Sequence, residues 1–108
     1  MINQPVIDSI SSLLSPYSGN INKAALYGSM ARGAENPNDC DLLIVTGVKV
    51  DSAEWKSLKQ LIKKMTCNFF DKFELSLNVE LLTSGEWYEN YSFFKDLIEI
   101  KIISIYSI

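Results

Sequence analysis

Two aspartates, Asp39 and Asp41, stand one residue apart at the start of an apolar segment. Alternate residues of a strand point to the same face of its sheet, so the two carboxylates would project together while Cys40 points into the core. Adjacent carboxylates repel each other unless a cation neutralises them. A hard cation such as Mg²⁺ prefers oxygen ligands and keeps positions open for phosphate oxygens. The pair therefore predicts a magnesium site that also accepts a phosphorylated ligand.

A second motif, Gly28-Ser29, ends another apolar segment and precedes a short helical turn. Glycine lets the backbone approach an anion closely, and the free N–H groups at a helix start favour negative charge. The Ser29 hydroxyl adds a hydrogen bond, and the Arg32 guanidinium can contact phosphate oxygens from one helical step later. Each feature alone is common in turns and strand ends. An anion-binding turn followed by a carboxylate pair is what a metal-bound triphosphate requires.

The elements that would position these motifs follow from hydrophobic periodicity and helix-capping residues. Helices are predicted over residues 5–14, 29–33, 53–70 after a cap at Asp51-Ser52, and from a cap at Thr83 or Ser84 with Glu86 to about residue 98. Strands are predicted over residues 21–27, 39–46, 75–83 and 102–108. The alternating order predicts one α+β domain over residues 1–108, with a small mixed β-sheet packed against helices.

The composition is that of a small soluble globular protein, with 108 residues, of which 47% are hydrophobic and 21% are charged. The formal net charge is −3, so the basic surplus that grips a nucleic-acid backbone is missing, and no long nucleic acid is expected. The lysines of one helix, at positions 56, 59, 63 and 64, fit a solvated outer face better than a binding patch. A domain of this size has a modest core, which favours a protein partner or a homo-oligomer.

Several classes of chemistry are excluded or disfavoured by residue type. The chain has no histidine, and Cys40 and Cys67 form no metal-binding pattern, so Ser-His and Cys-His catalysis and histidine metal sites are excluded. No segment is long and apolar enough for a signal or a membrane span, which predicts a cytoplasmic protein without membrane contact. Aromatic side chains at helical or segment spacing are interpreted as core rather than as base-stacking platforms, at positions Trp55, Phe69, Phe70, Trp87, Phe93 and Phe94.

The two motifs together resemble a known family. Gly28-Ser29-Met30-Ala31-Arg32-Gly33 followed by Asp39-Cys40-Asp41 is similar to the signature of the minimal nucleotidyltransferases of the DNA polymerase beta superfamily. That signature is a Gly-Ser turn, often continued by x-Ala-Arg-Gly, and then Asp-x-Asp within a strand. Residues 79–87 also resemble the strand and Thr-Pro-Glu-Glu-Trp segment of many members. The likeness covers most of the chain beyond the first predicted helix and implies the polymerase-beta-like nucleotidyltransferase fold.

The resemblance implies transfer of a nucleoside monophosphate, often AMP, from ATP or another nucleoside triphosphate to an acceptor hydroxyl. Asp39 and Asp41 would hold two Mg²⁺ ions, and Gly28 and Ser29 would bind the β- and γ-phosphates. The family also places a third carboxylate on a neighbouring strand. The expected position carries Asn78, which has no charge to supply. Glu80 would face the same side and could replace that carboxylate as a catalytic residue and metal ligand, or could be an ordinary exposed strand residue.

Three functions remain open at this stage. The first is an active nucleotidyltransferase whose acceptor is a partner protein, by analogy with minimal family members that act as antitoxins and modify a small toxin encoded beside them. The second is a catalytically degenerate module that senses nucleotide or binds a partner, for which the apolar residues 102–108 would suit strand pairing. The third is a generic α+β domain in which the Asp-x-Asp pattern is accidental.

Overall fold

A computed structural model describes residues 4–33, 39–94 and 97–100, without the side chains of residues 29, 30, 98 and 99. Its centre is a four-stranded mixed sheet with the order β3-β2-β1-β4. The strands are β1 (Ile21–Tyr27), β2 (Asp39–Thr46), β3 (Ser76–Thr83) and the short β4 (Ile98–Glu99). Strand β1 is antiparallel to β2 and β4, whereas β3 is parallel to β2. The chain therefore has the predicted α+β class with a small mixed sheet.

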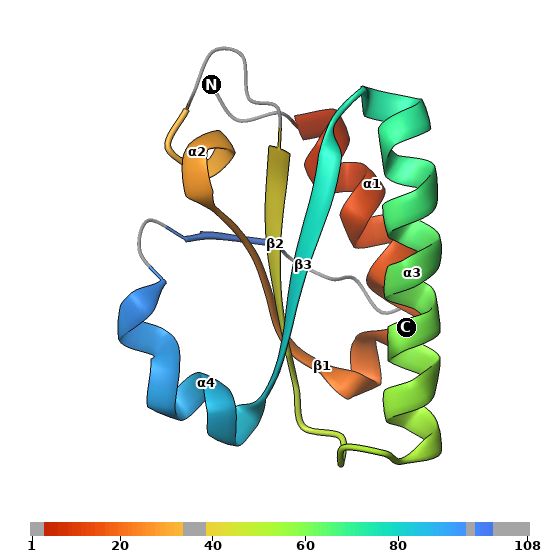
Figure 1. Cartoon of the computed structure of the whole chain (residues 1–108), viewed down its shortest axis with the longest axis vertical. Helices are drawn as coiled ribbons and strands as arrows, with labels where there is room; N and C mark the ends of the chain where they lie inside the picture. The colour runs from red at the N-terminus through yellow and green to blue at the C-terminus, as the bar shows by residue number, and fades with distance from the viewer. Residues whose placement is uncertain (1–3, 34–38, 95–96, 101–108) are drawn as a thin grey trace, which may run out of the picture.

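Helices cover the two faces of this sheet unequally. Figure 1 shows α1 (Gln4–Leu14) and the long α3 (Ala53–Phe73) together on one side, with the shorter α4 (Ser84–Asn90) on the other. The four-residue helix α2 (Gly28–Ala31) continues directly from the end of β1. Two 3-10 helices, η1 (Ser15–Asn20) and η2 (Tyr91–Phe93), follow α1 and α4. Within the described ranges, no helix is long and apolar enough to cross a membrane.

Strand β2 is buried on both faces, because it lies between two other strands and between two helical layers. Cys40, Leu42 and Ile44 join the large core beneath α1 and α3. Leu43 and Val45 face α4 and pack near Trp87 and Phe94. A strand covered on both faces needs a nearly continuous apolar run, which residues 42–45 supply. Asp39 and Asp41 occupy the polar end of this strand.

Helix α3 begins where the capping pattern predicts and ends a few residues later than predicted. The Ser52 side chain accepts a hydrogen bond from the Trp55 N–H at 3.2 Å, which satisfies an N–H group that has no partner inside the helix. The helix runs to Phe73 rather than to about residue 70. It stops where Glu74 adopts a left-handed conformation with φ 56° and donates its N–H to the Phe70 carbonyl at 2.8 Å. This turn leads directly into β3.

The last predicted helix is correct at its start and wrong at its end. Thr83 and Glu86 form a reciprocal capping box at the start of α4. The helix ends at Asn90 instead of about residue 98, since Phe94 turns back onto the sheet and Ile98–Glu99 pair with β1 as a strand. Tertiary contacts override the local helical pattern here. The strand predicted over residues 102–108 lies outside the described residues.

Candidate functional site

The turn from β1 into α2 places Gly28 directly against Asp41. Gly28 has φ 76°, a left-handed conformation that side chains rarely adopt. A Cβ atom at this position would collide with Asp41 Oδ2 and would lie only 3.1 Å from Asp41 Cγ. The glycine is therefore required twice, once for its backbone angle and once for the close approach of the carboxylate. The juxtaposition expected from the two motifs is present.

The register of the three long strands gathers polar side chains around Asp41. Tyr27 of β1 and Asn78 of β3 are its partners on either side. Asn78 Nδ2 donates a hydrogen bond to Asp41 Oδ1 at 3.1 Å, while Asp41 Oδ2 faces the glycine turn. Asp39 is exposed and Asp41 is half-buried, whereas Cys40 between them is fully buried. The two carboxylates therefore share one face of β2, as the strand period predicts.

Glu80 lies on the same face of the sheet as Asp41, two residues after Asn78 on β3. It pairs in register with Leu43, two residues beyond the pairing of Asn78 with Asp41. Burial raises the pKa of the Tyr27 phenol, and the negative charges of Asp41 and Glu80 raise this pKa further. Both carboxylates therefore lie close enough to act on one hydroxyl.

The acidic residues do not form a ready three-ligand cage. Within the part of the chain that the structure describes, no group of three or more Asp, Glu or Cys side chains is placed to hold a metal ion. Asp39, Asp41 and Glu80 are thus on one face without closing around a common point. Asn78 is the register partner of Asp41 and lies two residues before Glu80 on β3. Its amide oxygen would face Asp41 after a side-chain flip. The donor set suits a hard cation that takes its remaining ligands from phosphate oxygens.

The other predicted nucleotide-binding residues lie at the same turn. Arg32 is exposed, and its backbone N–H donates to the Gly28 carbonyl at 3.2 Å, which closes the α2 turn. Ser29 is the second residue of α2, but its side chain lies outside the described atoms. The roles assigned to both residues stay predictions.

Cys40 is a fully buried part of the core. Burial raises the pKa of its thiol to about 12, and the Asp41 charge adds to this effect. The thiol therefore stays protonated at neutral pH and behaves as a small apolar group. This agrees with the prediction that Cys40 points away from the two aspartates.

The aromatic residues divide between core and surface. Phe69 is buried, and Trp55, Trp87 and Phe94 are half-buried. The prediction of core positions is wrong for two others, since Phe70 is 56% exposed and Phe93 is 79% exposed. Phe70 lies on the solvent side of α3, and Phe93 follows the early end of α4, where helical spacing no longer applies.

Tyr27 is a site residue that the sequence pattern did not single out. Its position before Gly28 indicates only the end of a strand, whereas the antiparallel register places it beside Asp41. Its ring also packs edge-on against Phe94, with centroids 5.2 Å apart. Strand register depends on long-range pairing, so the neighbouring Gly28 was the only local sign in the sequence that Tyr27 lies near the candidate site.

Comparison with known proteins supports the fold. No protein-family model matches the sequence, and no curated protein matches it. The structure is similar to the crystal structure of a proposed nucleotidyltransferase from Sulfolobus solfataricus, with a TM-score of 0.54 and 16% sequence identity. The match covers 86% of this chain and 77% of that chain. The chain therefore has an α+β nucleotidyltransferase fold.

Proposed function

We propose that this protein is a nucleotidyltransferase that moves a nucleoside monophosphate, AMP in the first instance, from a nucleoside triphosphate to an acceptor hydroxyl. The observation that carries the proposal is the contact between the Gly28 turn and the Asp41 carboxylate. A helix start that favours phosphate and a carboxylate that favours Mg²⁺ lie side by side in a nucleotidyltransferase fold. This arrangement suits a metal-bound triphosphate.

Each residue has a definite task in this proposal. The backbone at Gly28 and Ser29, together with the Arg32 guanidinium, would bind the β- and γ-phosphates. Asp39 and Asp41, joined by Glu80, would hold Mg²⁺, two ions in the complete site. Bound Mg²⁺ supplies neutralisation of the phosphate charge and orientation of the triphosphate.

The transfer step can be written with its atoms balanced. The acceptor oxygen forms a bond to the α-phosphorus, the bond from that phosphorus to the bridging oxygen breaks, and pyrophosphate leaves. Glu80 would take the proton of the acceptor hydroxyl, because its carboxylate lies on the face of Asp41 and is exposed to solvent. Glu80 would then have the role that the resemblance assigns to a third carboxylate.

Asp41→Asn tests the proposal most directly, because it removes the charge and preserves the shape of the side chain. We expect transfer of label from α-phosphate-labelled ATP to an acceptor in cell extract to fall by about 100-fold or more, as for loss of a group that stabilises transition-state charge. Asp71→Asn, an exposed carboxylate on α3, is the matched control and should keep full activity. Equal labelling by both variants would contradict the proposal.

A second function is favoured by one observation, the neutral Asn78 beside Asp41. Without a carboxylate there, the protein could bind Mg²⁺ and nucleotide and act as a nucleotide-sensing or partner-binding module, as an antitoxin would. Calorimetric titration with ATP, with and without Mg²⁺, separates the two functions. Magnesium-dependent binding without any labelled product would favour the module, and binding with product that disappears in Asp41→Asn would favour the enzyme.

A further inference from the structure

A cavity of about 330 Å³ lies between the edge strand β3 and α4, next to the proposed site. Its described lining residues come from β3, α4 and the segment after it, and they are Glu80, Leu82, Glu86, Asn90, Phe93 and Phe94. Glu80 connects this cavity to the face of Asp41, since it lies two residues after Asn78, the register partner of Asp41 on β3. Among its described lining residues, none is proposed to bind phosphate. The cavity is therefore adjacent to the nucleotide position and distinct from it.

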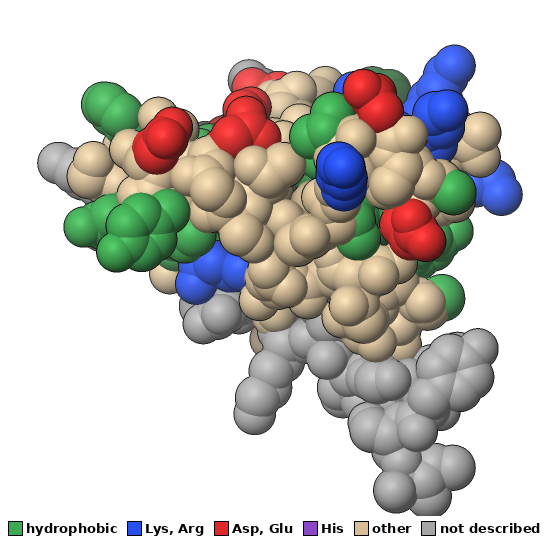
Figure 2. All heavy atoms as spheres, turned by 90° about the horizontal axis from the view of Figure 1, so that it is seen from below, with side chains coloured by type: hydrophobic (Ala, Val, Ile, Leu, Met, Phe, Trp, Pro, Cys, Tyr) green, Lys and Arg blue, Asp and Glu red, His purple; other side chains and the backbone are tan. Residues whose placement is uncertain are grey.

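Three exposed aromatic side chains lie on α4 and η2, and one of them, Phe93, lines this cavity. Tyr88 is 80% exposed, Tyr91 is 58% exposed and Phe93 is 79% exposed. We call these three residues the α4 aromatic patch. Figure 2 shows hydrophobic side chains gathered at the α4 end of the molecule, with acidic side chains beside them. Soluble proteins rarely expose several large aromatic residues together, and such clusters mark interaction surfaces.

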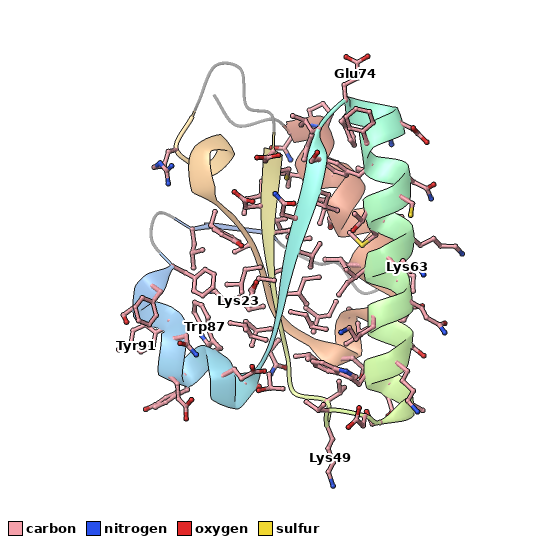
Figure 3. The ribbon with its side chains drawn as sticks, in the orientation of Figure 1. Lys23, Lys49, Lys63, Glu74, Trp87 and Tyr91 are labelled. Atoms are coloured by element: carbon pink, nitrogen blue, oxygen red, sulfur yellow. The ribbon has the colours of Figure 1, made fainter. Side chains whose placement is uncertain are left out.

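The described charged residues of the cavity lining are acidic, which favours a cationic partner. Glu80 and Glu86 line the cavity, and Glu89 is exposed one helical turn after Glu86. Among the described residues of the lining, none is a lysine or an arginine. A contact between a cation and an aromatic ring of α4 already exists within the chain, where the Lys23 ammonium lies 5.7 Å from the centroid of the Trp87 ring. Figure 3 shows Trp87 on α4 and Tyr91 just after it in η2, with Lys23 of β1 near Trp87.

We propose that the cavity and the α4 aromatic patch form a docking site for a basic, apolar segment of a partner protein. A lysine or arginine of the partner enters the cavity beside Glu86, and apolar side chains of the partner cover Phe93 and its neighbours. A small amine would occupy only the cavity. Tyr88 and Tyr91 lie outside the lining, so only a longer ligand could contact them as well. That this segment presents an acceptor hydroxyl near Asp41 rests on the proposed function.

The test measures binding in the absence of nucleotide. The probe is a fluorescein-labelled short peptide of alternating arginine and leucine, and its comparison peptide has glutamate in place of each arginine. Fluorescence anisotropy with the full chain should show binding of the basic peptide and at least about tenfold weaker binding of the acidic one, because three carboxylates surround the surface.

Two substitutions locate the binding surface. Phe93→Ser should weaken binding about tenfold, as for loss of an aromatic anchor, and it should not unfold the exposed η2 turn. Glu86→Gln should weaken binding about threefold through loss of charge. It keeps the oxygen that accepts the Thr83 N–H, so the α4 cap stays intact. The matched controls are Phe70→Ser and Glu74→Gln, two exposed positions on and after α3, and both should bind like the original protein.

Four results would overturn the docking proposal. They are equal binding of the basic and acidic peptides, unchanged binding in both Phe93→Ser and Glu86→Gln, full competition by free arginine amide, or a dimer in light scattering that Phe93→Ser dissociates. The third result would indicate a small-amine site, and the fourth would show that a second copy covers the patch.

Because this assay contains no nucleotide, loss of peptide binding with intact magnesium-dependent ATP binding refutes the docking site alone. Intact peptide binding without any ATP binding refutes the proposed function alone.

Discussion

The two faces of the sheet bury different amounts of apolar surface. The face beneath α1 and α3 contains the large core, to which both helices, the strands β1, β2 and β3, and Ile100 just after β4 contribute. The buried cluster on the α4 face consists, in the described ranges, of Leu43, Val45 and Leu82, with half-buried aromatic rings around them. The same α4 face carries Asp41 and Glu80. The first face therefore supplies stability, and the second leaves room for polar side chains and a ligand.

Alternate side chains of strand β2 point to the two faces of the sheet. Cys40, Leu42 and Ile44 are fully buried in the large core, and burial of each apolar side chain stabilises a fold by about 1.5–3 kcal/mol. These contacts hold the strand in register and so hold Asp41 on the opposite face. The position of Asp41 is thus determined largely by apolar neighbours on the opposite face of the strand.

The largest expected effect compares truncations on the two faces. Leu58→Ala, in the large core, should lower the free energy of unfolding by about 2–5 kcal/mol, because it leaves a cavity that α3 cannot close. Leu82→Ala, in the small cluster, should have an effect at or below the low end of this range, since solvent already reaches that side. Urea denaturation of both variants provides the measurement. Equal losses would show that the two faces stabilise the fold equally.

A smaller effect is expected at the glycine turn. Gly28→Ala should lower the free energy of unfolding by about 1–2 kcal/mol, the usual strain of a left-handed residue with a side chain. It should also abolish nucleotide binding, because the added methyl group displaces the Asp41 carboxylate. Gly85→Ala is the matched control, as open space surrounds that position, and the helix should become more stable by about 0.5–1 kcal/mol. Retained ATP affinity in Gly28→Ala would separate Asp41 from the nucleotide site.

The smallest expected effect concerns the polar face itself. Asn78→Asp replaces the donor to Asp41 with a second carboxylate, so without metal the melting temperature should fall by a few degrees, corresponding to about 1 kcal/mol. Mg²⁺ should restore more stability to this variant than to the original protein, because the added carboxylate stands in register with Asp41, where Asn78 supplies no charge. Thermal melts in EDTA and in magnesium chloride provide the comparison. Asn68→Asp, on the exposed side of α3, should respond to neither condition.

Much of the fold could be predicted because it is encoded locally. The alternation of the strand at residues 39–46 and the Ser52 cap of α3 depend on neighbouring residues alone, and both are confirmed. The end of α4 could not be predicted in this way. Phe94 leaves the helix to pack on Tyr27 and Trp87, contacts that join residues far apart in the sequence.

The candidate site was predictable in its residues and only partly in its geometry. The sequence motifs name Gly28 and Asp41, and the structure confirms that they meet. The motif could not show that Asn78 is bonded to Asp41, nor that Tyr27 lies on the same face. These relations depend on strand order and register, which arise from packing over the whole sheet.

The amino-acid sequence by itself determined the order of helices and strands, the shared face of Asp39 and Asp41, and the need for glycine at position 28. Short-range sterics and side-chain periodicity are sufficient for these features. Only the tertiary structure decided which carboxylate meets the glycine turn, which residue hydrogen-bonds to it, and which aromatic residues of α4 and η2 stay exposed. These outcomes depend on how the sheet and its two helical layers pack, and that packing balances apolar burial along the entire chain.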